Sequence, residues 1–245
     1  MKIIENLKYA QYPSCLIDLI LPDKEPFDVI IWFHGGGLES GSRKCITGGI
    51  GRELAEIGFA VASADYRLYP SAKFPDYIKD AARAVRYVID HSDMYGKVGR
   101  FFVGGSSAGA YLTLMLALDR SYFRDAGVDV SKISGYLSDS AQTTVHYNVL
   151  RERSIDPSLE RIDEAAPLYH LNKNSDFGNM LLVCYDEDIK CRPEQNRLFY
   201  AAAMHICPQN RMLFKQLPGR HCSGTSKKNS DGSYDFVDCL KELLS

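Results

Sequence analysis

The chain has 245 residues, of which 45 % are hydrophobic and 24 % are charged, and its formal net charge is -2 at pH 7. This length and composition predict a single soluble domain, residues 1–245, with a large core. The small net charge gives no reason to expect nucleic acid or an anionic membrane as a partner. Because the sequence holds no apolar run of about 18 residues, no membrane span is predicted.

The N-terminus and the cysteines predict a cytoplasmic protein. Residues 1–6 lack the apolar stretch and the small-residue cleavage site of a secretory signal peptide. The seven cysteines are odd in number and scattered, without a C-x-x-C pair. This pattern favours reduced thiols over a disulfide framework or a zinc site, so no metal is expected.

Extended and helical patterns alternate along the chain. The predicted strands are residues 3–9, 14–21, 29–33, 59–64, 101–103, 133–137, 180–185 and 212–217. The predicted helices are residues 47–57, 75–91, 108–118, 192–204 and 234–244. Short apolar strands that alternate with helices predict an α/β fold, with a mostly parallel eight-stranded sheet and helices on both faces. In such sheets a ligand site lies at the carboxyl ends of the strands.

One segment, residues 139–178, interrupts this alternation. It separates two predicted strands and holds only short helical or irregular pieces, such as the turn at Asp156-Pro157. We expect this segment to form a small cap insertion over the site. The alternative is an ordinary crossover with one extra helix.

The strand at 101–103 leads into Gly105-Ser106-Ser107-Ala108-Gly109, and a helix follows at once. This is the G-x-S-x-G pattern in the strand–turn–helix context that exposes a serine nucleophile at the top of a sheet. Only Ser107 fits the frame, since Ser106 would need glycine at position 108. Small flanking residues let the strand and the helix approach closely. The alternative is a Gly/Ser-rich turn without chemistry.

A serine hydroxyl needs a base to take its proton, and the base needs an acid to orient it. Of the six histidines, His221 alone follows the last predicted strand in a long polar loop. Three carboxylates follow the preceding strand, at Asp186, Glu187 and Asp188. We expect Asp188 to be the acid because it lies farthest into the loop and can reach across to His221. Asp186 is the first alternative and Glu187 the second.

A glycine-rich loop, His34-Gly35-Gly36-Gly37, follows the third predicted strand. Glycines allow backbone N–H groups to turn toward the same point as the N–H that follows the nucleophile. We therefore expect an oxyanion hole formed by Gly36, Gly37 and Ala108. A phosphate cradle is excluded because no Gly-Lys-Ser/Thr follows. His34 is expected to fix the loop by hydrogen bonding.

The chain resembles the α/β-hydrolase esterases of the hormone-sensitive-lipase type and the shorter bacterial acetyl and feruloyl esterases. The resemblance covers residues 28–222 and rests on His34-Gly35-Gly36-Gly37, Asp65-Tyr66-Arg67-Leu68, Gly105-Ser106-Ser107-Ala108-Gly109, Tyr185-Asp186-Glu187-Asp188 and His221. It implies the α/β-hydrolase fold, with the triad in the order serine, acid, histidine. It also implies that Asp65 and Arg67 are structural and tie the glycine loop down.

The sequence departs from that family pattern in two places. The glycine loop arrives at residue 34, so the long N-terminal cap of the hormone-sensitive-lipase type has no room. Tyr185 stands where glycine is commoner in the family. A site without that cap is more open, which favours a carbohydrate-linked or aryl ester over a long-chain lipid.

The expected function is that of a serine carboxylesterase acting on short-chain acyl or aryl esters, with acetyl and feruloyl esters of carbohydrates included. Ser107 would carry the acyl group, and no cofactor is needed. Leu38 and Tyr66 are expected to line the substrate pocket. The expected partner is a small-molecule ester, and the sequence leaves a homodimer open.

Two other functions stay open. One is amide cleavage, as in kynurenine formamidases or prolyl-oligopeptidase-like peptidases, which share this catalytic domain. The absence of a propeller domain argues against the large peptidases. The other is a non-catalytic binding protein on the same scaffold. Such proteins lose a triad member, whereas all three members are present here.

Overall fold

One sheet of eight strands runs through the computed structural model, which describes residues 1–245. The strands are β1 (Lys2–Lys8), β2 (Leu16–Leu21), β3 (Phe27–Phe33), β4 (Phe59–Ala64), β5 (Val98–Ser106), β6 (Ile133–Asp139), β7 (Asn179–Glu187) and β8 (Arg211–Arg220). Their spatial order is β1-β2-β4-β3-β5-β6-β7-β8. The pairs β1–β2 and β2–β4 are antiparallel and all others are parallel, which confirms the predicted mostly parallel sheet.

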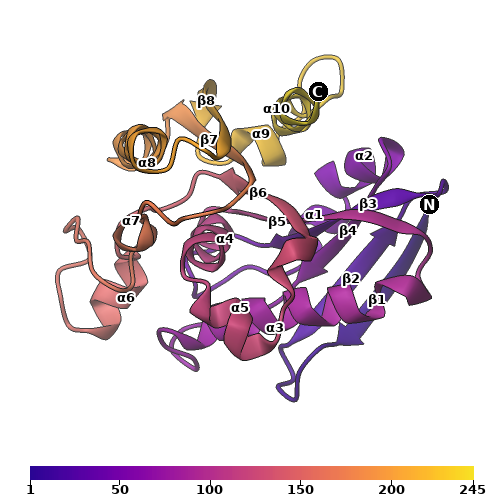
Figure 1. Ribbon diagram of the computed structural model, residues 1–245, viewed down its shortest axis with the longest axis horizontal. Helices are drawn as coiled ribbons and strands as arrows, with labels where there is room; N and C mark the ends of the chain where they lie inside the picture. Colours follow the sequence, from indigo (N-terminus) through magenta and orange to yellow (C-terminus); the bar gives the residue numbers. More distant parts are fainter.

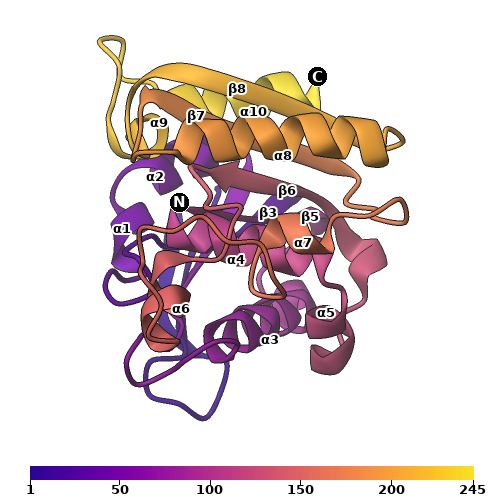
Figure 2. The same ribbon diagram turned by 90° about the vertical axis from the view of Figure 1, so that its left-hand side faces the viewer.

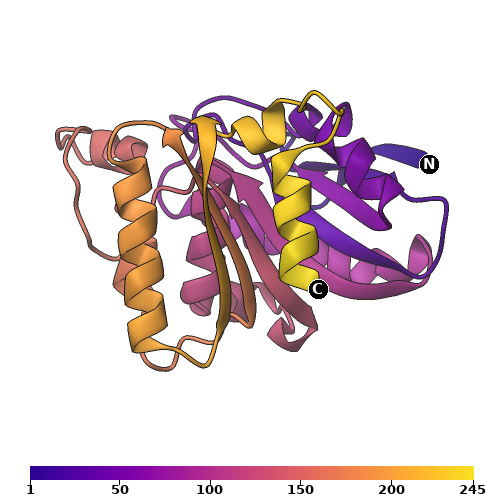
Figure 3. The same cartoon turned by 90° about the horizontal axis from the view of Figure 1, so that it is seen from above.

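Helices cover both faces of the sheet, as expected (Figures 1 and 3). They are α1 (Lys44–Thr47), α2 (Ile50–Glu56), α3 (Asp76–His91), α4 (Ala108–Leu118), α5 (Ser121–Ala126), α6 (Tyr147–Glu152), α7 (Pro167–His170), α8 (Arg192–Ile206), α9 (Ser223–Ser226) and α10 (Asp235–Leu244), with 3₁₀ turns at Ser92–Met94 and Val130–Lys132. The helices α3, α4 and α8 contribute to the core on one face, and α2 and α10 to the core on the other.

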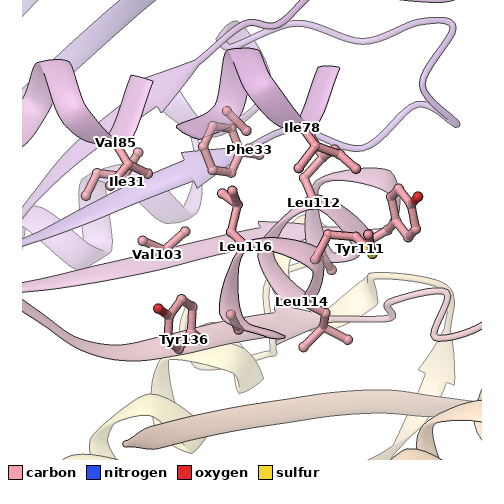
Figure 4. Close-up of a cluster of buried hydrophobic side chains, with 14 of the residues drawn as sticks. Ile31, Phe33, Ile78, Val85, Val103, Tyr111, Leu112, Leu114, Leu116 and Tyr136 are labelled. Atoms are coloured by element: carbon pink, nitrogen blue, oxygen red, sulfur yellow. The ribbon is translucent and has the colours of Figure 1, made fainter. Parts of the chain in front are cut away.

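Helix α4 lies at the centre of the larger core. Figure 4 shows Leu112 and Leu116 of this helix among Ile31 and Phe33 of β3 and Val103 of β5. Every residue of α4 is buried, because β3, β5 and β6 pack on one side of it and α3 and α7 on the other. A helix enclosed in this way is apolar all round and not amphipathic, and this rigid element carries Ser107 at its start.

Several predicted elements differ from those observed, and β5 extends on both sides of the predicted 101–103. The helix expected at 47–57 is divided into α1 and α2 at Gly48-Gly49, because a glycine pair is a poor helix interior. Strand β8 runs through Pro218 and Gly219 to Arg220, farther than expected, and stays paired with β7 almost to its end. The next residue is therefore delivered to the carboxyl edge of the sheet.

The segment between β6 and β7 carries α6 and α7 and runs beside α4 (Figure 2). It is anchored to the main body, since Val149 and Leu150 join the larger core. The hydroxyl of Tyr111 in α4 also donates to the carbonyl of Ala165 at 2.9 Å. Among all the helices, none combines the length and the apolarity needed to cross a bilayer.

The enclosed position of α4 makes its leucines sensitive to truncation. We expect Leu116→Ala to lower the free energy of unfolding by about 2–5 kcal/mol, because it removes buried methyl groups and leaves a cavity. Leu198→Ala is the matched control: that side chain is 53 % exposed, and a change of at most about 0.5 kcal/mol is expected. Urea unfolding of both variants measures the difference, and equal losses would contradict the packing described here.

Candidate active site

Ser107 occupies a sharp turn between β5 and α4. Its backbone has φ 54° and ψ -114°, a conformation that residues with a side chain rarely adopt. The turn needs small neighbours, because a Cβ at Gly109 would lie 1.9 Å from the carbonyl oxygen of Phe33, and one at Gly105 would lie 2.4 Å from the carbonyl carbon of Gly109. The N–H of Ser107 donates to the carbonyl of Asp139 at 2.7 Å, which fixes the turn against β6.

His221 and Asp188 are brought together by the ends of the last two strands. His221 follows β8 directly, and its Nδ1 lies 2.5 Å from Oδ1 of Asp188. The second carboxylate oxygen, Oδ2, accepts from the hydroxyl of Ser140 at 2.7 Å and from the N–H of Tyr185 at 3.3 Å. Burial raises the pKa of Asp188, but the hydrogen bonds from His221 and Ser140 outweigh it and hold the pKa below its ordinary value. The carboxylate is therefore charged at neutral pH.

The two alternative acids have other partners. Asp186 accepts a hydrogen bond from the N–H of Gly219 at 2.8 Å. The side chain of Glu187 is 70 % exposed and lies 3.7 Å from that of Arg220. Of the three carboxylates at the end of β7, the structure brings Asp188 alone to His221.

Ser107 and His221 line the same cavity, of about 340 Å³, at the carboxyl edge of the sheet. The Nε2 atom of His221 is buried and has no hydrogen-bond partner in the chain. No hydrogen bond joins it to Ser107, although such bonds often tighten only when substrate is bound. The unpartnered Nε2 atom of His221 and the strained Ser107 thus belong to the wall of one cavity.

The glycine loop supplies free donors beside this cavity. Gly36 and Gly37 have φ of 110° and 64°, and neither N–H finds an acceptor in the chain. Ala108 is the first residue of α4, where an N–H has no acceptor within the helix. Tyr147 and Asn148 of α6 hold the loop from outside. The amide of Asn148 donates to the carbonyl of Gly37, and the Tyr147 hydroxyl lies where a Cβ of Gly37 would be.

His34 fixes the glycine loop and does not contact Ser107, Asp188 or His221. Its Nδ1 contacts the carbonyl of Gly35 at 2.6 Å, and its ring stacks on Tyr66 with centroids 4.4 Å apart. Burial lowers the pKa of His34, so the ring is neutral at pH 7. Nearby, Asp65 accepts from the N–H of Arg43 at 2.5 Å and pairs with its guanidinium, which holds the next turn of the loop.

The guanidinium of Arg43 also contacts the first two strands. Its Nε donates to Asp18 of β2 at 2.9 Å, and its Nη2 donates to the side chain of Asn6 in β1 at 2.5 Å. Arg67, in contrast, pairs with Asp80 of α3 at 2.6 Å and not with the glycine loop. The expected structural role of Asp65 at the loop therefore matches its contacts, whereas Arg67 stabilises a neighbouring turn.

The structure corrects the two expected pocket residues. Leu38 has a left-handed backbone, with φ 66°, which turns its side chain into the larger core, where it is fully buried. Tyr66 is 1 % exposed, and its hydroxyl donates to the carbonyl of His34 at 2.9 Å. Neither lines the cavity of Ser107. Its apolar wall comes instead from Trp32, Ile46 and Ile50, together with the thiol-bearing Cys45 and Cys222.

A second buried carboxylate, Asp139, lies next to His221 and Asp188 and was not predicted from the sequence. It accepts from the hydroxyls of Tyr185 at 2.8 Å and Thr225 at 2.6 Å. Burial raises the pKa of Asp139 to about 6, and these hydrogen bonds offset only part of the rise. Tyr185, the residue that departs from the family pattern, thus binds Asp139 and also accepts from the N–H of Gly224 at 2.8 Å. The place of Asp139 in the chain was the available signal, because it is the last residue of β6 and the other site residues directly follow strand ends.

Comparison with known proteins places this geometry in a family. A profile of the BD-FAE family matches residues 17–150, more than half of the chain. The chain belongs to the BD-FAE family. The matched part of this BD-FAE protein contains the glycine loop and Ser107, whereas Asp188 and His221 lie beyond it.

Relatives and solved structures agree with this membership. Esterase LipI of Mycobacterium tuberculosis is 35 % identical to the BD-FAE chain over 106 residues, which cover 43 % of this chain and 31 % of LipI. The chain spans about a third of the length of the first curated relatives that it matches.

Esterase B of Lactobacillus rhamnosis superposes with a TM-score of 0.81 at 17 % identity, over 99 % of this chain and 86 % of esterase B. A truncated carbohydrate esterase from gut microbiota superposes with a TM-score of 0.78 at 16 % identity, over 100 % of this chain and 97 % of that one. Likeness at such identity concerns the fold, and it confirms the expected α/β-hydrolase fold.

Asp139 makes the stability of the protein depend on pH. Its folded-state pKa of about 6 lies above the ordinary 3.8, so its favourable contribution is complete below pH 3.8 and is lost as the pH rises through 6. Relative to Asp139→Asn, the wild-type protein should therefore lose up to about 3 kcal/mol of stability between pH 4 and pH 7.

Urea unfolding of both proteins across this pH range measures the effect. If the difference in stability between the wild type and Asp139→Asn stays constant with pH, the raised pKa of the buried Asp139 carboxyl group is contradicted. The exposed Glu187→Gln serves as the control, for which the difference from wild type should not change.

Proposed function

We propose that this BD-FAE protein is a serine carboxylesterase, with Ser107 as nucleophile, His221 as base and Asp188 as the orienting acid. The observation that carries the proposal is the 2.5 Å contact between Asp188 and Nδ1 of His221, while the buried Nε2 stays unpartnered at the cavity of Ser107. A carboxylate on Nδ1 leaves the lone pair of the neutral imidazole on Nε2, where a base for the serine must have it.

Acylation follows from these positions. Ser107 Oγ attacks the ester carbonyl while Nε2 of His221 takes the hydroxyl proton, and a tetrahedral oxyanion forms. The imidazolium is stabilised by Asp188, whose lowered pKa keeps it charged. His221 then gives its proton to the leaving alcohol oxygen as the ester C–O bond breaks. The acyl group stays on Ser107.

Deacylation repeats these steps with water. His221 takes a proton from a water molecule that attacks the acyl-enzyme, and it returns the proton to Ser107 Oγ as the acid leaves. In both halves the negative charge would fall between the free N–H groups of Gly36 and Gly37 and that of Ala108. Donors fixed before the reaction stabilise the charged state most, at about 3–4 kcal/mol for each lost donor of this kind.

The proposed substrates are esters with a short acyl or an aryl group, carbohydrate-linked esters among them. A cavity of about 340 Å³ has room for a small acyl group and an adjoining ring. Its wall combines the apolar Trp32, Ile46 and Ile50 with the hydroxyls of Thr225 and Ser226. Residues 139–178 would act as a small cap that braces the oxyanion loop through Tyr147 and Asn148.

The nucleophile can be tested by substitution and by labelling. Ser107→Ala should lower kcat for p-nitrophenyl acetate at least about 1000-fold, because the variant lacks the proposed nucleophile. It should also abolish labelling by a fluorophosphonate. The neighbouring Ser106→Ala is the matched control and should still be labelled. Labelling that persists in Ser107→Ala, or a wild-type protein that is never labelled, would refute the assignment.

The acid can be tested by comparing two isosteric changes in one loop. Asp188→Asn should lower kcat by a factor on the order of 10³–10⁴ near pH 7, since an amide cannot hold His221 in the required tautomer. Asp186→Asn, which touches only the N–H of Gly219, should change kcat by no more than about threefold. If Asp186→Asn lowered kcat more than Asp188→Asn, Asp186 would be the orienting acid.

A further inference from the structure

A second cavity, of about 370 Å³, opens beside the acid loop. It begins at Ile189, the residue after Asp188, and continues over Lys190 and Cys191 to the first turn of α8. Its opposite wall comes from the segment between β6 and β7. Neither the proposed nucleophile nor the proposed base lines this cavity, so the steps above give it no role.

Arg192, in the wall of this cavity, is a buried cation that forms no ion pair. Its side chain is only 3 % exposed, and its Nη1 donates to the carbonyl of Ser140 at 2.6 Å. Nη2 makes a long contact of 3.5 Å with the amide oxygen of Gln142, and Nε has no partner. Most of its five N–H donors are therefore weakly used or unused.

The other buried arginine of the chain shows how unusual this is. Arg43 is 9 % exposed and is paired with two carboxylates, Asp18 and Asp65. A buried guanidinium is costly unless it is paired in this way. The negative charges of Asp188 and Glu160 act on Arg192 electrostatically, but neither carboxylate forms an ion pair with it. Its unused donors are therefore available to an anionic partner.

The charge of the surrounding wall also suits an anion. Lys190 lines the cavity beside Arg192, and α8, which is 15 residues long, begins there, so its positive dipole end lies at the same place. One acid lines the cavity, Glu160, and its Oε2 already accepts from Thr144 at 2.7 Å and Gln195 at 2.8 Å. Two cations thus oppose one carboxylate.

Two contacts join this cavity to the reacting centre. Tyr147 lines the cavity, and its hydroxyl lies against Gly37 of the oxyanion loop. The carbonyl of Ser140 accepts from Arg192, while the hydroxyl of the same residue donates to Asp188. Through these contacts the second cavity adjoins the glycine loop, and Arg192 is linked to Asp188 by way of Ser140.

We propose that this second cavity is an anion subsite, in which Arg192 binds a free carboxylate of an ester whose reacting bond lies at Ser107. The inference rests on the proposed esterase function and narrows its substrates to esters that carry a second, ionised carboxyl group. The guanidinium is suited to this task because its planar fork of donors matches a carboxylate.

The test compares an anionic ester with a neutral one of similar length. The ratio of kcat/KM for p-nitrophenyl hemiglutarate to that for p-nitrophenyl butyrate should fall at least about tenfold in Arg192→Met, and Arg192→Lys should recover part of it. Glu160→Gln should raise the ratio, because it removes the opposing charge. Unchanged ratios in Arg192→Met and Glu160→Gln would overturn the proposal, and Glu160→Gln decides alone if Arg192→Met does not fold.

A second pair of esters locates the carboxylate. If the protein prefers 4-acetoxybenzoate over phenyl acetate and Arg192→Met loses this preference, the free carboxylate lies on the alcohol side of the ester. If it prefers the hemiglutarate instead, the free carboxylate lies on the acyl side. Either result supports the subsite.

A binding measurement separates this inference from the esterase function. Glutarate should bind the full-length Ser107→Ala protein in a calorimetric titration, at least about tenfold more weakly once Arg192→Met is added. Glutarate binding that depends on Arg192, combined with a wild-type protein that hydrolyses no ester, would keep the subsite and reject the proposed function. Esterase activity without glutarate binding, and without a charge preference, would reject the subsite alone.

Discussion

The contact between Gly109 and the end of β3 is the constraint on which the site depends. Because a Cβ at position 109 would lie 1.9 Å from the carbonyl oxygen of Phe33, α4 can begin beside β3 only where that residue has no side chain. Ser107, two residues before Gly109, has the strained backbone of this turn. The loop that begins at His34 lies next to the serine, since a Cβ at Gly35 would lie 3.2 Å from the Cβ of Ser107. One steric requirement thus fixes the proposed nucleophile relative to the proposed oxyanion donors.

The other half of the site is attached through two residues at the end of β6. The carbonyl of Asp139 accepts from Ser107, and its carboxylate accepts from Thr225, which follows His221 in the chain by four residues. Ser140 donates to Asp188. Nearly all members of this buried network are hydrogen-bonded to one another, and such networks specify a single arrangement. The loops after β5, β7 and β8 therefore meet in a defined geometry and not merely near one another.

The sequence predicted the placement of a chemical group where that group directly follows a strand. Ser107, Asp188 and His221 all do so, and a parallel sheet gathers such positions at one edge. The sequence was insufficient for Leu38, because the residue type leucine gives no indication of a positive φ. It was also insufficient for Tyr66, because the hydrogen-bond partner of its hydroxyl lies 32 residues away. The unpaired charge of Arg192 could not be foreseen, because its burial depends on the path of an irregular segment without hydrophobic periodicity.

The guanidinium of Arg43 links the outermost part of the sheet to the glycine loop. It contacts Asn6 in β1 and Asp18 in β2 on one side, and Asp65 on the other. Edge strands are the first to fray, and β1 is paired along one side only. Transient opening of this antiparallel hairpin would release the arginine, and with it the turn that follows the loop. Order at the edge of the sheet and order at the proposed oxyanion donors are in this way thermodynamically coupled, although β1 itself contributes no residue to the cavity of Ser107.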